Sequence, residues 1–381
     1  MWTTLIFGGT LALFTAGTLN LLWHLRWMNR LPSVKALRPV AGNLRCSVVI
    51  AARNEEQRIK ETIRRLLAQH GVEVEVIVVD DRSTDGTSNV VQEMAKADAR
   101  LRVIRIEKLP DGWLGKCHAC HIGATVATGE WLLFTDADCW LHADVIARAI
   151  HVAQRERVEH VTLAPGITTA SPGVRAWHLM FLLSFANWFS GVNRERPRAY
   201  LGLGAFNLVR ASAYRECGGY EALRLTVLDD VKLGLLLRRA GKRTRAFLGV
   251  EDVECHCGTN LAGMIEIMEK NYFAAVEFRL PLALGCCILM VLLACTVLIG
   301  AFSQTPIGFA AALSPLCLVA PAASLARRIG WFWGVAFGAP FMIPVFTWAL
   351  LNSTFVTLRR GGIRWRETFY SLDKLRAGGV R

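Results

Sequence analysis

The sequence predicts a two-part protein: an α/β domain built on a doubly wound, mostly parallel sheet, and transmembrane segments at both ends of the chain. Between residues 45 and 278, short runs rich in Val, Ile and Leu alternate with amphipathic helical patterns, which is typical of repeated βα units. Long apolar runs lie before and after this region. The composition agrees, because 53% hydrophobic residues is high for a soluble enzyme and 20% charged residues is high for a membrane bundle.

An apolar run at the N-terminus, residues 1–26, predicts one transmembrane anchor. Arg26 and Arg30 follow the run, no basic residue precedes them, and no convincing small-residue cleavage site appears. These features favour an uncleaved anchor with its N-terminus outside over a secretory signal peptide.

The middle of the chain contains strands separated by helices. Four apolar or β-branched runs suit buried parallel strands, at 46–52, 74–81, 101–107 and 130–138. Helical patterns lie between them, at 55–70, 83–97 and 115–128. Repeated βα units place their binding site at the carboxyl ends of the strands.

An apolar segment inside this domain, residues 173–192, has two interpretations. It is either a buried helix or an interfacial helix that lies on the bilayer and lines the entry of a lipid acceptor. The sequence alone leaves both open.

Residues 280–356 predict two to three C-terminal transmembrane segments. Two spans fit 280–302 and 306–326, and a third apolar run at 331–356 contains two prolines. Three full spans would put the basic tail, residues 357–381, outside the cell, against the positive-inside rule. A broken or re-entrant last segment keeps this tail in the cytoplasm and is the favoured interpretation, with a conventional third span as its rival.

The formal net charge is +13, and many of the arginines lie at the ends of the apolar runs. This pattern predicts a multi-pass cell-membrane protein whose soluble domain faces the cytoplasm, and no nucleic-acid partner. The eleven cysteines are then expected to be mostly reduced thiols.

Acidic pairs follow two of the predicted strands. In WLLFTDADCW, residues 131–140, an extended strand would place Asp136 and Asp138 on one face. Asp80 and Asp81 end another strand. Because like charges at this distance need a cation between them, the pattern predicts a divalent metal at the carboxyl edge of the sheet.

Four motifs occur in a fixed order: SVVIAARNEE, VIVVDDRSTDGT, FTDAD and LDDVKLGLLLRRAG. On these motifs the region 45–275 resembles family-two glycosyltransferases of the GT-A fold. The segments GWLGKCHACHIG, GAFNLVRASAYRECGGY and GGIRWRETFY resemble the membrane-anchored branch that includes ceramide glucosyltransferases and bacterial carotenoid- and hopanoid-associated glycosyltransferases. The resemblance implies a GT-A catalytic domain over residues 45–278.

The resemblance implies a nucleotide-sugar site with a hard divalent ion, Mg²⁺ or Mn²⁺, because carboxylate and phosphate oxygens suit such an ion. By resemblance, Asp138 binds the metal, and Asp136 contacts both the ion and the donor. Further donor contacts are implied for Ala52, Arg53, Glu55, Asp80 and Asp81. The structural alternatives are strand-end caps for the Asp136–Asp138 pair and a helix first-turn charge for Glu55.

Three more residues take roles from the resemblance. Lys116 starts a predicted helix, where a cation and free backbone N–H groups suit phosphate, although a solvated surface lysine is the alternative. Asp230 is implied as the general base of an inverting transfer, with Asp229 positioning it or raising its pKa. The structural alternative is that Asp229 and Asp230 are only two negative charges at the N-terminus of a helix.

The C-terminal tail departs from the processive relatives, which carry Gln-x-x-Arg-Trp. Here RGGIRW at 360–365 is one residue too long, and Trp365 with Arg366 matches a WR-x-T-x-Y tail of the carotenoid-like branch. The resemblance implies that Arg366 reaches the diphosphate and that one sugar is transferred rather than a polymer made.

Two cysteine-rich segments resemble other sites. CHACH at 117–121 matches the C-x-x-C-H signature of haem attachment, and CHC at 255–257 offers zinc ligands. Neither cofactor is predicted, because the first segment lies in an expected cytoplasmic helix and the second lacks a standard zinc spacing.

Together these features predict an inverting, metal-dependent glycosyltransferase that moves one hexose from a UDP-sugar to a membrane lipid of the ceramide, carotenoid, hopanoid or glycerolipid type. Transfer to polyprenyl phosphate and processive polysaccharide synthesis stay open as alternatives. The few C-terminal spans disfavour a polymer pore. A non-enzymatic binding module is least favoured, because all four acidic positions of the resemblance are intact.

Overall fold

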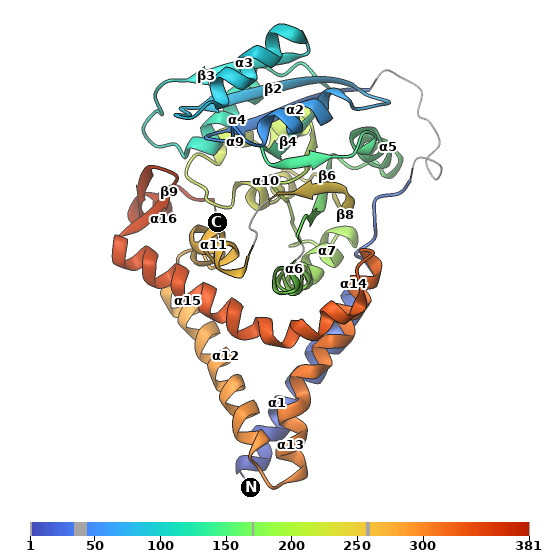
Figure 1. Cartoon of the computed structure of the whole chain (residues 1–381), viewed down its shortest axis with the longest axis vertical. Helices are drawn as coiled ribbons and strands as arrows, with labels where there is room; N and C mark the ends of the chain where they lie inside the picture. The colour runs from blue at the N-terminus through green and yellow to red at the C-terminus, as the bar shows by residue number, and fades with distance from the viewer. Residues whose placement is uncertain (1, 34–43, 170, 257–259, 381) are drawn as a thin grey trace. The chain divides into compact units, whose positions relative to one another are not determined.

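The computed structural model describes residues 2–33, 44–169, 171–256 and 260–380 (Figure 1). The chain divides into two compact units. The sheet unit comprises Met28–Thr168, Gly191–Cys257 and Ala377–Arg381, and the helical unit comprises Met1–Trp27, Thr169–Ser190 and Gly258–Arg376. The helical unit thus includes residues 169–190 and 258–278, which the sequence placed in one α/β domain.

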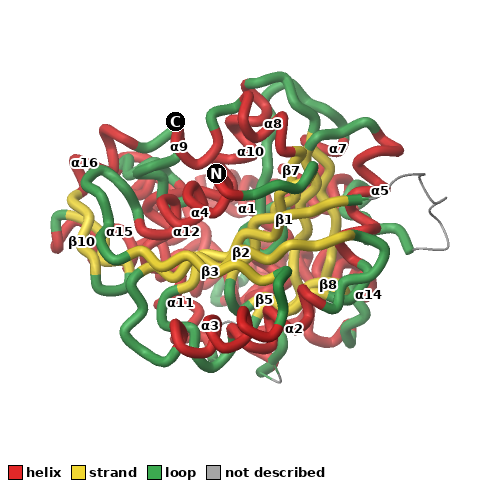
Figure 2. Tube along the Cα trace, turned by 90° about the horizontal axis from the view of Figure 1, so that it is seen from above, coloured by secondary structure: helices red, strands yellow, loops and turns green. Residues whose placement is uncertain are grey.

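A single large sheet organises the sheet unit (Figure 2). Its strands are β1 (Arg45–Ala52), β2 (Glu73–Asp81), β3 (Leu101–Ile106), β4 (Trp131–Asp136), β5 (Cys139–Leu141), β6 (His160–Ile167), β7 (Asn207–Arg210) and β8 (Thr244–Cys255). Among the described residues they lie in the order β3-β2-β1-β4-β7-β6-β8-β5. Strand β7 runs antiparallel to both neighbours and β5 antiparallel to β8, while the other pairs are parallel. The predicted mostly parallel sheet is confirmed.

Helices cover both faces of this sheet, and β2 therefore has apolar side chains on both faces. Val76 and Val78 belong to a core that includes side chains of α2 (Ile59–Leu67), α3 (Thr87–Ala97) and α5 (Val145–Glu156). Ile77 and Val79 join a second core with Ala119 of α4 (Gly115–Val126). Continuous burial along a strand is what a doubly wound sheet requires. The unit also includes the helices α8 (Ala211–Glu216), α9 (Gly219–Ala222) and α10 (Asp229–Arg239).

Among its described residues, the helical unit contains four helical stretches that are long and apolar enough to cross a membrane. They are Trp2–Leu25 (α1), Leu280–Ala301 (α12), Pro306–Arg328 (α13, Pro306–Leu313; η2, Ser314–Leu318; α14, Val319–Arg328) and Trp333–Arg360 (η3, Trp333–Phe341; α15, Met342–Arg360). The sequence expected one N-terminal and two to three C-terminal segments, and these stretches match that number. The tail continues into a hairpin of β9 (Gly362–Trp365) and β10 (Thr368–Ser371), and then α16 (Leu372–Gly378).

The last apolar stretch changes from a 3₁₀ helix to a regular helix without a gap, and the re-entrant segment that the sequence favoured stays a prediction. Residues 333–341 form a 3₁₀ helix that contains Pro340, and a regular helix begins only at Met342. In Figure 1, α15 runs across the direction of α12, whereas α1 lies alongside α13 and α14. The second half of α15 carries polar contacts to α11 (Leu261–Ala275): Arg360 pairs with Glu269 at 2.8 Å, and Phe273 N donates to Ser353 Oγ at 2.9 Å.

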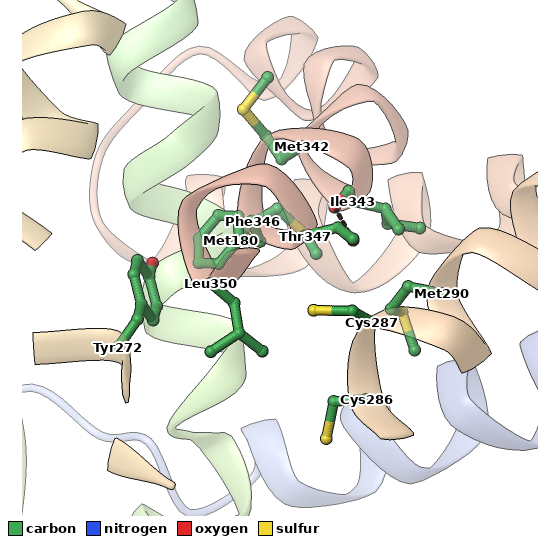
Figure 3. Close-up of a pocket in the computed structure, with 10 residues that line it drawn as sticks. All are labelled: Met180, Tyr272, Cys286, Cys287, Met290, Met342, Ile343, Phe346, Thr347 and Leu350. Atoms are coloured by element: carbon green, nitrogen blue, oxygen red, sulfur yellow. Dashed lines mark hydrogen bonds between the residues drawn. The ribbon is translucent and has the colours of Figure 1, made fainter. Parts of the chain in front are cut away.

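The apolar segment 173–192 forms two helices, α6 (Pro172–Ser184) and α7 (Ala186–Asn193). Helix α6 packs against η3, α11, α14 and α15 within the helical unit and buries Trp177 and Leu179, which favours the buried interpretation for this helix. Trp188 of α7 stays 40% exposed. Between α6, α11, α12 and α15 lies an apolar cavity (Figure 3).

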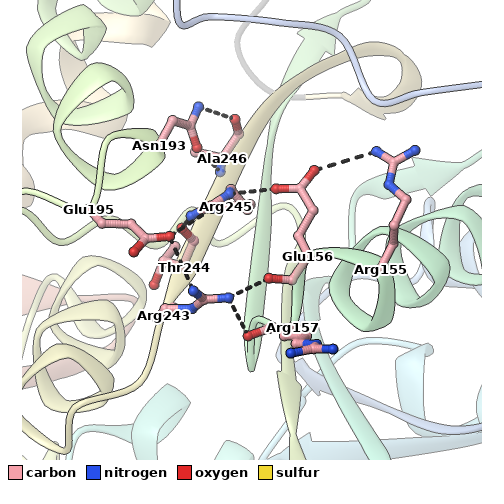
Figure 4. A network of polar contacts seen from close by, with 9 residues as sticks. All are labelled: Arg155, Glu156, Arg157, Asn193, Glu195, Arg243, Thr244, Arg245 and Ala246. Carbon is pink, nitrogen blue, oxygen red and sulfur yellow. Dashed lines mark hydrogen bonds and ion pairs between the residues drawn. The ribbon is translucent and has the colours of Figure 1, made fainter.

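A polar network holds the start of β8 in the sheet unit (Figure 4). Arg245 pairs with Glu156 of α5 at 2.6 Å and with Glu195 at 2.8 Å. Asn193 exchanges two hydrogen bonds with the backbone of Ala246, each 2.9 Å long. These contacts fix a strand whose other end pairs Cys255 with Cys139 of β5.

Candidate active site

Three neighbouring strands bring the predicted acidic residues to one edge of the sheet. In the register of β1, Ala52 lies opposite Asp80 of β2, and Ala51 lies opposite Asp136 of β4. The two acidic strand ends therefore flank β1, one on each side. This is the edge at which parallel α/β sheets bind ligands.

Asp136 and Asp138 meet through a turn and not through strand alternation. Strand β4 ends at Asp136, and Ala137 and Asp138 form a turn before β5, so the expectation of a strand running through Asp138 is wrong. The cause is a distant contact: the carbonyl of buried Ala137 accepts a 2.6 Å hydrogen bond from Thr62 Oγ1 on α2. Side-chain atoms of Asp136, Asp138 and Cys139 still lie within 4.8 Å of one another.

This turn has the chemistry of a site for a hard divalent cation. Burial and the charge of Asp136 raise the pKa of Asp138, so the charged form of Asp138 is disfavoured without a cation beside it. The Cys139 thiol lies 2.9 Å from Cys255 Sγ, and this contact together with burial holds its pKa well above the usual value. Mg²⁺ and Mn²⁺ prefer oxygen to sulfur ligands, so the two carboxylates are the groups of this turn that fit such an ion.

Lys116, in the first turn of α4, faces three carboxylates. Its Nζ lies 2.7 Å from Asp136 Oδ1 and 3.8 Å from Asp229 Oδ2. Burial lowers the pKa of Lys116, but the charges of Asp136, Asp229 and Asp230 outweigh this effect and hold that pKa well above its ordinary value. The alternative of a solvated surface lysine is therefore wrong.

The acidic pair opens α10, and its two members have different surroundings. Asp229 is buried, and its Oδ2 accepts a 3.0 Å hydrogen bond from the Tyr220 hydroxyl. Asp230 Oδ2 accepts from Gly204 N at 2.7 Å, and its Oδ1 accepts from Val231 N at 2.8 Å. Burial and the charge of Asp229 raise the pKa of Asp230 to about 6. Asp230 is thus ionised at neutral pH and still more basic than an ordinary carboxylate, which suits a general base.

Gly204 is a site residue that was not singled out from the sequence, although it lies in the GAFNLVRASAYRECGGY segment. A Cβ at this position would lie 3.0 Å from Asp136 Oδ2 and 3.2 Å from Asp230 Oδ2. The lack of a side chain therefore lets β4 and α10 bring their carboxylates to the same place.

Replacing Gly204 with Ala is expected to lower kcat roughly tenfold to a hundredfold, because the methyl group displaces reacting groups by a fraction of an ångström. The measurement is sugar transfer by the full chain in detergent or nanodiscs. Gly17→Ala is the matched control, since in the described parts of the chain no atom outside the helix's own backbone lies within 4 Å of a Cβ at Gly17. Equal activity of the two variants would show that the close approach at Gly204 has no part in the reaction.

The ends of β1 and β2 form a second group of site residues. Asp81 pairs with Arg82 at 2.7 Å and lies 3.9 Å from Arg53. Asp80 is fully buried; its Oδ1 accepts from Ser83 N, and its Oδ2 has no hydrogen-bond partner within the described parts of the chain. An unsatisfied buried carboxylate oxygen is costly and marks a position where a ligand donor fits.

Backbone strain marks the same two strand ends. Asn54 and Arg82 adopt left-handed conformations, with φ of 57° and 59°. Asn tolerates this region, but an arginine there is uncommon and is typical of functional loops. Asn54 Oδ1 accepts from Thr84 N at 2.8 Å, which ties the two loops together.

Helix α4 connects the two groups. A Cβ on Gly115 would collide with Asp81 Oδ2, so the Asp81 carboxylate rests against the first residue of the helix whose second residue, Lys116, contacts Asp136. Asp81, Asp138 and Asp230 therefore belong to one continuous set of contacts. Glu55 N donates to Thr87 Oγ1 at 2.8 Å, and the Glu55 carbonyl accepts from Ile59 N at the start of α2. Arg366 lies in the helical unit and stays a prediction.

Residues 47–218 match the family model described as Glycosyl transferase family 2. This region, called the family 2 domain from here on, is therefore similar to glycosyl transferase family 2. The matched region includes the ends of β1, β2 and β4, and it stops before Asp229 and Asp230.

The family 2 domain has relatives among glycolipid-type enzymes. The chain is 27% identical over 207 residues to a 4,4'-diaponeurosporenoate glycosyltransferase of Staphylococcus haemolyticus, covering 53% of this chain and 54% of the relative. It is 29% identical over 215 residues to a beta-monoglucosyldiacylglycerol synthase of Nostoc sp., covering 55% and 42%. The chain thus spans about half the length of these relatives. With a diaponeurosporenoate glycosyltransferase of Staphylococcus aureus the alignment extends to 91% and 93%, at 24% identity.

A solved structure shares the fold of the family 2 domain and the helices around it. A mannosyltransferase from Pyrobaculum calidifontis, in complex with GDP-Man and Mn²⁺, superposes with a TM-score of 0.55 at 20% identity, covering 93% of this chain and 99% of that one. The GT-A fold that the sequence resemblance implied is thereby confirmed.

The described residues of the cysteine-rich segments take part in packing within the sheet unit. Cys117 and Cys120 are buried in α4, and Cys117 Sγ donates to the Thr226 carbonyl. Burial raises the pKa of both thiols. In the CHC segment, Cys255 contacts Cys139, while Cys257 lies outside the described residues.

Proposed function

We propose that this chain is a membrane-bound, inverting, metal-dependent glycosyltransferase that moves one hexose from a UDP-sugar to a membrane lipid. The observation that carries the proposal is the cluster in which Lys116, Asp136, Asp229 and Asp230 converge beside the Asp136–Asp138 turn. A structural role alone does not account for so many carboxylates at the ligand-binding edge of one sheet.

Asp230 acts as the general base. Its two oxygens accept one backbone hydrogen bond each, and a carboxylate has further lone pairs to accept the acceptor's proton. As the proton moves to Asp230, the acceptor oxygen forms its bond to the anomeric carbon. The bond from that carbon to the diphosphate breaks, and its electron pair leaves with the nucleotide. Attack and departure on opposite faces invert the anomeric centre.

The donor contacts come from the strand ends. Asp80 offers an unpaired oxygen to an N–H group of the base, and Ala52, Arg53, Glu55 and Asp81 surround the nucleotide. Asp136 and Asp138 would hold Mg²⁺ or Mn²⁺, which when bound neutralises the charge that develops on the diphosphate. Lys116 orders Asp136 and the acidic pair and adds positive charge near the phosphates.

The acceptor is a membrane lipid with a hydroxyl or carboxyl group. Two findings support this choice: the relatives are named for transfer to a carotenoid acid or to form a glucosyldiacylglycerol, and four apolar stretches accompany the family 2 domain. The identity of the hexose is set by side chains that no local motif reveals.

We also propose a topology in which α1, α12 and α13–α14 cross the membrane and α15 lies at its cytoplasmic surface. Arg328 Nη1 donates to the Leu25 carbonyl at 2.8 Å, so the C-terminal ends of α1 and α14 lie on the same side of the membrane. Basic residues lie at the C-terminal end of each of these helices. The ion pair between Arg360 of α15 and Glu269 of α11 suits the interface better than hydrocarbon. The family 2 domain, the tail and Arg366 then lie in the cytoplasm.

A C-terminal fluorescent fusion is expected to fluoresce, and an N-terminal epitope is expected to be reached by antibody on intact cells. In this topology three crossings separate the two ends of the chain. A C-terminal tag that is accessible only from outside the cell would refute this topology and the role of Arg366.

The function itself is tested with the purified full chain in nanodiscs made from total bacterial lipid with Mn²⁺ or Mg²⁺. UDP-glucose, UDP-galactose, UDP-N-acetylglucosamine and GDP-mannose are compared as donors. We expect lipid-dependent release of UDP and a new hexosylated lipid by mass spectrometry. Preference for GDP-mannose would correct the donor, and no transfer from any donor with any lipid would refute the proposal.

A further inference from the structure

The cavity in the helical unit is bounded by four helices, α6, α11, α12 and α15 (Figure 3). It measures about 300 Å³, which is much larger than the gaps left in a well-packed interior and lies at the lower end of small-ligand sites. Its lining includes Met180, Tyr272, Cys287, Met290, Phe346 and Leu350.

The wall is apolar and adaptable. Phe346 stacks with Trp177 of α6 at 5.6 Å between ring centroids and meets Tyr272 of α11 edge-on at 6.0 Å. The Thr347 hydroxyl is already used, since it donates to the Ile343 carbonyl at 2.9 Å. A cavity with such walls does not hold ordered water, and flexible methionine side chains shape themselves to an apolar ligand.

Tyr272 provides the one unsatisfied polar atom that the described lining residues offer. Its hydroxyl oxygen is enclosed and has no hydrogen-bond partner within the described parts of the chain. Buried tyrosine hydroxyls normally find a partner, and leaving one unpaired costs free energy. An apolar cavity with a single unused hydroxyl fits a ligand that has one polar group on a hydrocarbon chain.

The position of the cavity in the helical unit favours a lipid over a soluble molecule. Met290, Cys286 and Cys287 lie on α12, and Phe346 and Leu350 on α15; both helices belong to stretches apolar enough to enter a membrane. Tyr272 lies on α11, which is not among those stretches. The polar atom and the apolar wall are therefore arranged as the head and the tail of a membrane lipid are.

We infer that this cavity binds one hydrocarbon chain of the acceptor lipid, and that Tyr272 donates a hydrogen bond to the polar group at the head of that chain. The inference rests on the proposed function for the identity of the lipid as acceptor. It assigns the recognition of the acceptor to residues outside the family 2 domain.

Filling the cavity tests the apolar part of the site. Leu350→Trp is expected to raise the KM for the lipid at least about tenfold while leaving the KM for the sugar nucleotide unchanged. Phe355→Trp is the matched control, because Phe355 lies on the same helix but is 63% exposed. Thermal unfolding of both variants checks the fold, and Leu350→Phe is a milder substitution if the tryptophan does not fold.

Removing the hydroxyl tests the polar part. Tyr272→Phe is expected to raise the KM for the lipid about two- to tenfold, the effect of one hydrogen bond. A merely structural role of Tyr272 would lower stability and leave the lipid KM unchanged. Unchanged lipid KM in both Tyr272→Phe and Leu350→Trp overturns the inference.

Binding is measured separately from catalysis, so that the failure of one proposal is distinguishable from the failure of the other. The full chain in nanodiscs is irradiated with a long-chain diacylglycerol that carries a diazirine on one acyl chain, and labelled peptides are mapped by mass spectrometry. We expect labels on α12 and α15, reduced at least fivefold by Leu350→Trp and not by Phe355→Trp. Labelling that is equal in both variants contradicts the cavity site, whether or not the chain transfers sugar.

Discussion

Asp230→Asn is expected to reduce kcat with a hydroxyl acceptor about a hundredfold to ten-thousandfold and to leave the KM for the sugar nucleotide nearly unchanged. The substitution keeps the size of the side chain but removes the group that takes the acceptor's proton, and general-base catalysis contributes an acceleration of this size. The measurement is steady-state transfer by the full chain in nanodiscs. Asp98→Asn is the matched control, because Asp98 precedes β3 and so lies at the amino ends of the strands, away from the site. Within the described residues its ion-pair partner is Arg100.

The pH profile supplies an independent sign of the same role. Since burial and Asp229 raise the pKa of Asp230 to about 6, kcat/KM should fall below about pH 6 as the base is protonated and should level off above it. The residual activity of Asp230→Asn should not show this fall of kcat/KM at low pH. A wild-type profile that is flat through pH 6 contradicts the assignment of Asp230.

Asp230→Asn should lower activity without lowering the stability of the fold. A carboxyl group whose pKa is higher in the folded than in the unfolded state stabilises the fold at low pH, and this contribution is lost as the pH rises through about 6. Asp230→Asn removes the buried charge, so its Tm at neutral pH should equal or exceed that of the wild type. Loss of activity with an unchanged or higher Tm separates a catalytic role from a folding defect.

The same variant reports the chemistry of the acceptor. A lipid hydroxyl needs a base, whereas a carboxylic acid or a phosphate is already ionised at neutral pH. Activity that survives in Asp230→Asn therefore points to an acid or polyprenyl phosphate acceptor. The relatives named for a carotenoid acid make this outcome informative.

The sheet was predictable because its central strands are buried on both faces. Val76 to Val79 alternate between two cores, so the sequence of β2 is continuously apolar and its acidic end stands out. The acidic pairs at the ends of β2 and β4 could then be placed at one edge by the topology of parallel strands alone.

The rest of the site depends on contacts that no local pattern encodes. The turn at Ala137 and Asp138 is set by Thr62, which precedes Ala137 by 75 residues. The position of Asp230 is set by Gly204, which is 26 residues away. The membership of α6 in the helical unit could not be read from its apolar composition, since a buried helix and an interfacial one are alike in sequence. Tyr272 gave no signal, because an unpaired hydroxyl is visible only once its surroundings are built.

Asp138→Asn is expected to lower metal-dependent activity at least about a hundredfold, because it removes one of the two carboxylates that fit the divalent ion. A binding measurement separates this effect from the reaction itself. Added Mn²⁺ should raise the Tm of the wild type by linkage and should leave the Tm of Asp138→Asn nearly unchanged.

In the absence of a divalent metal, Asp138→Asn should also be more stable than the wild type. The pKa of Asp138 is raised by burial and by Asp136, so in the absence of metal its charge disfavours the fold at neutral pH, and the neutral amide relieves that repulsion. Cys139→Ser distinguishes the carboxylates from the neighbouring sulfur as ligands: it should keep the Mn²⁺-induced rise in Tm, because a buried protonated thiol does not bind the ion. If Cys139→Ser loses this rise and Asp138→Asn keeps it, the metal is held by the thiol and the assignment of the carboxylates is wrong.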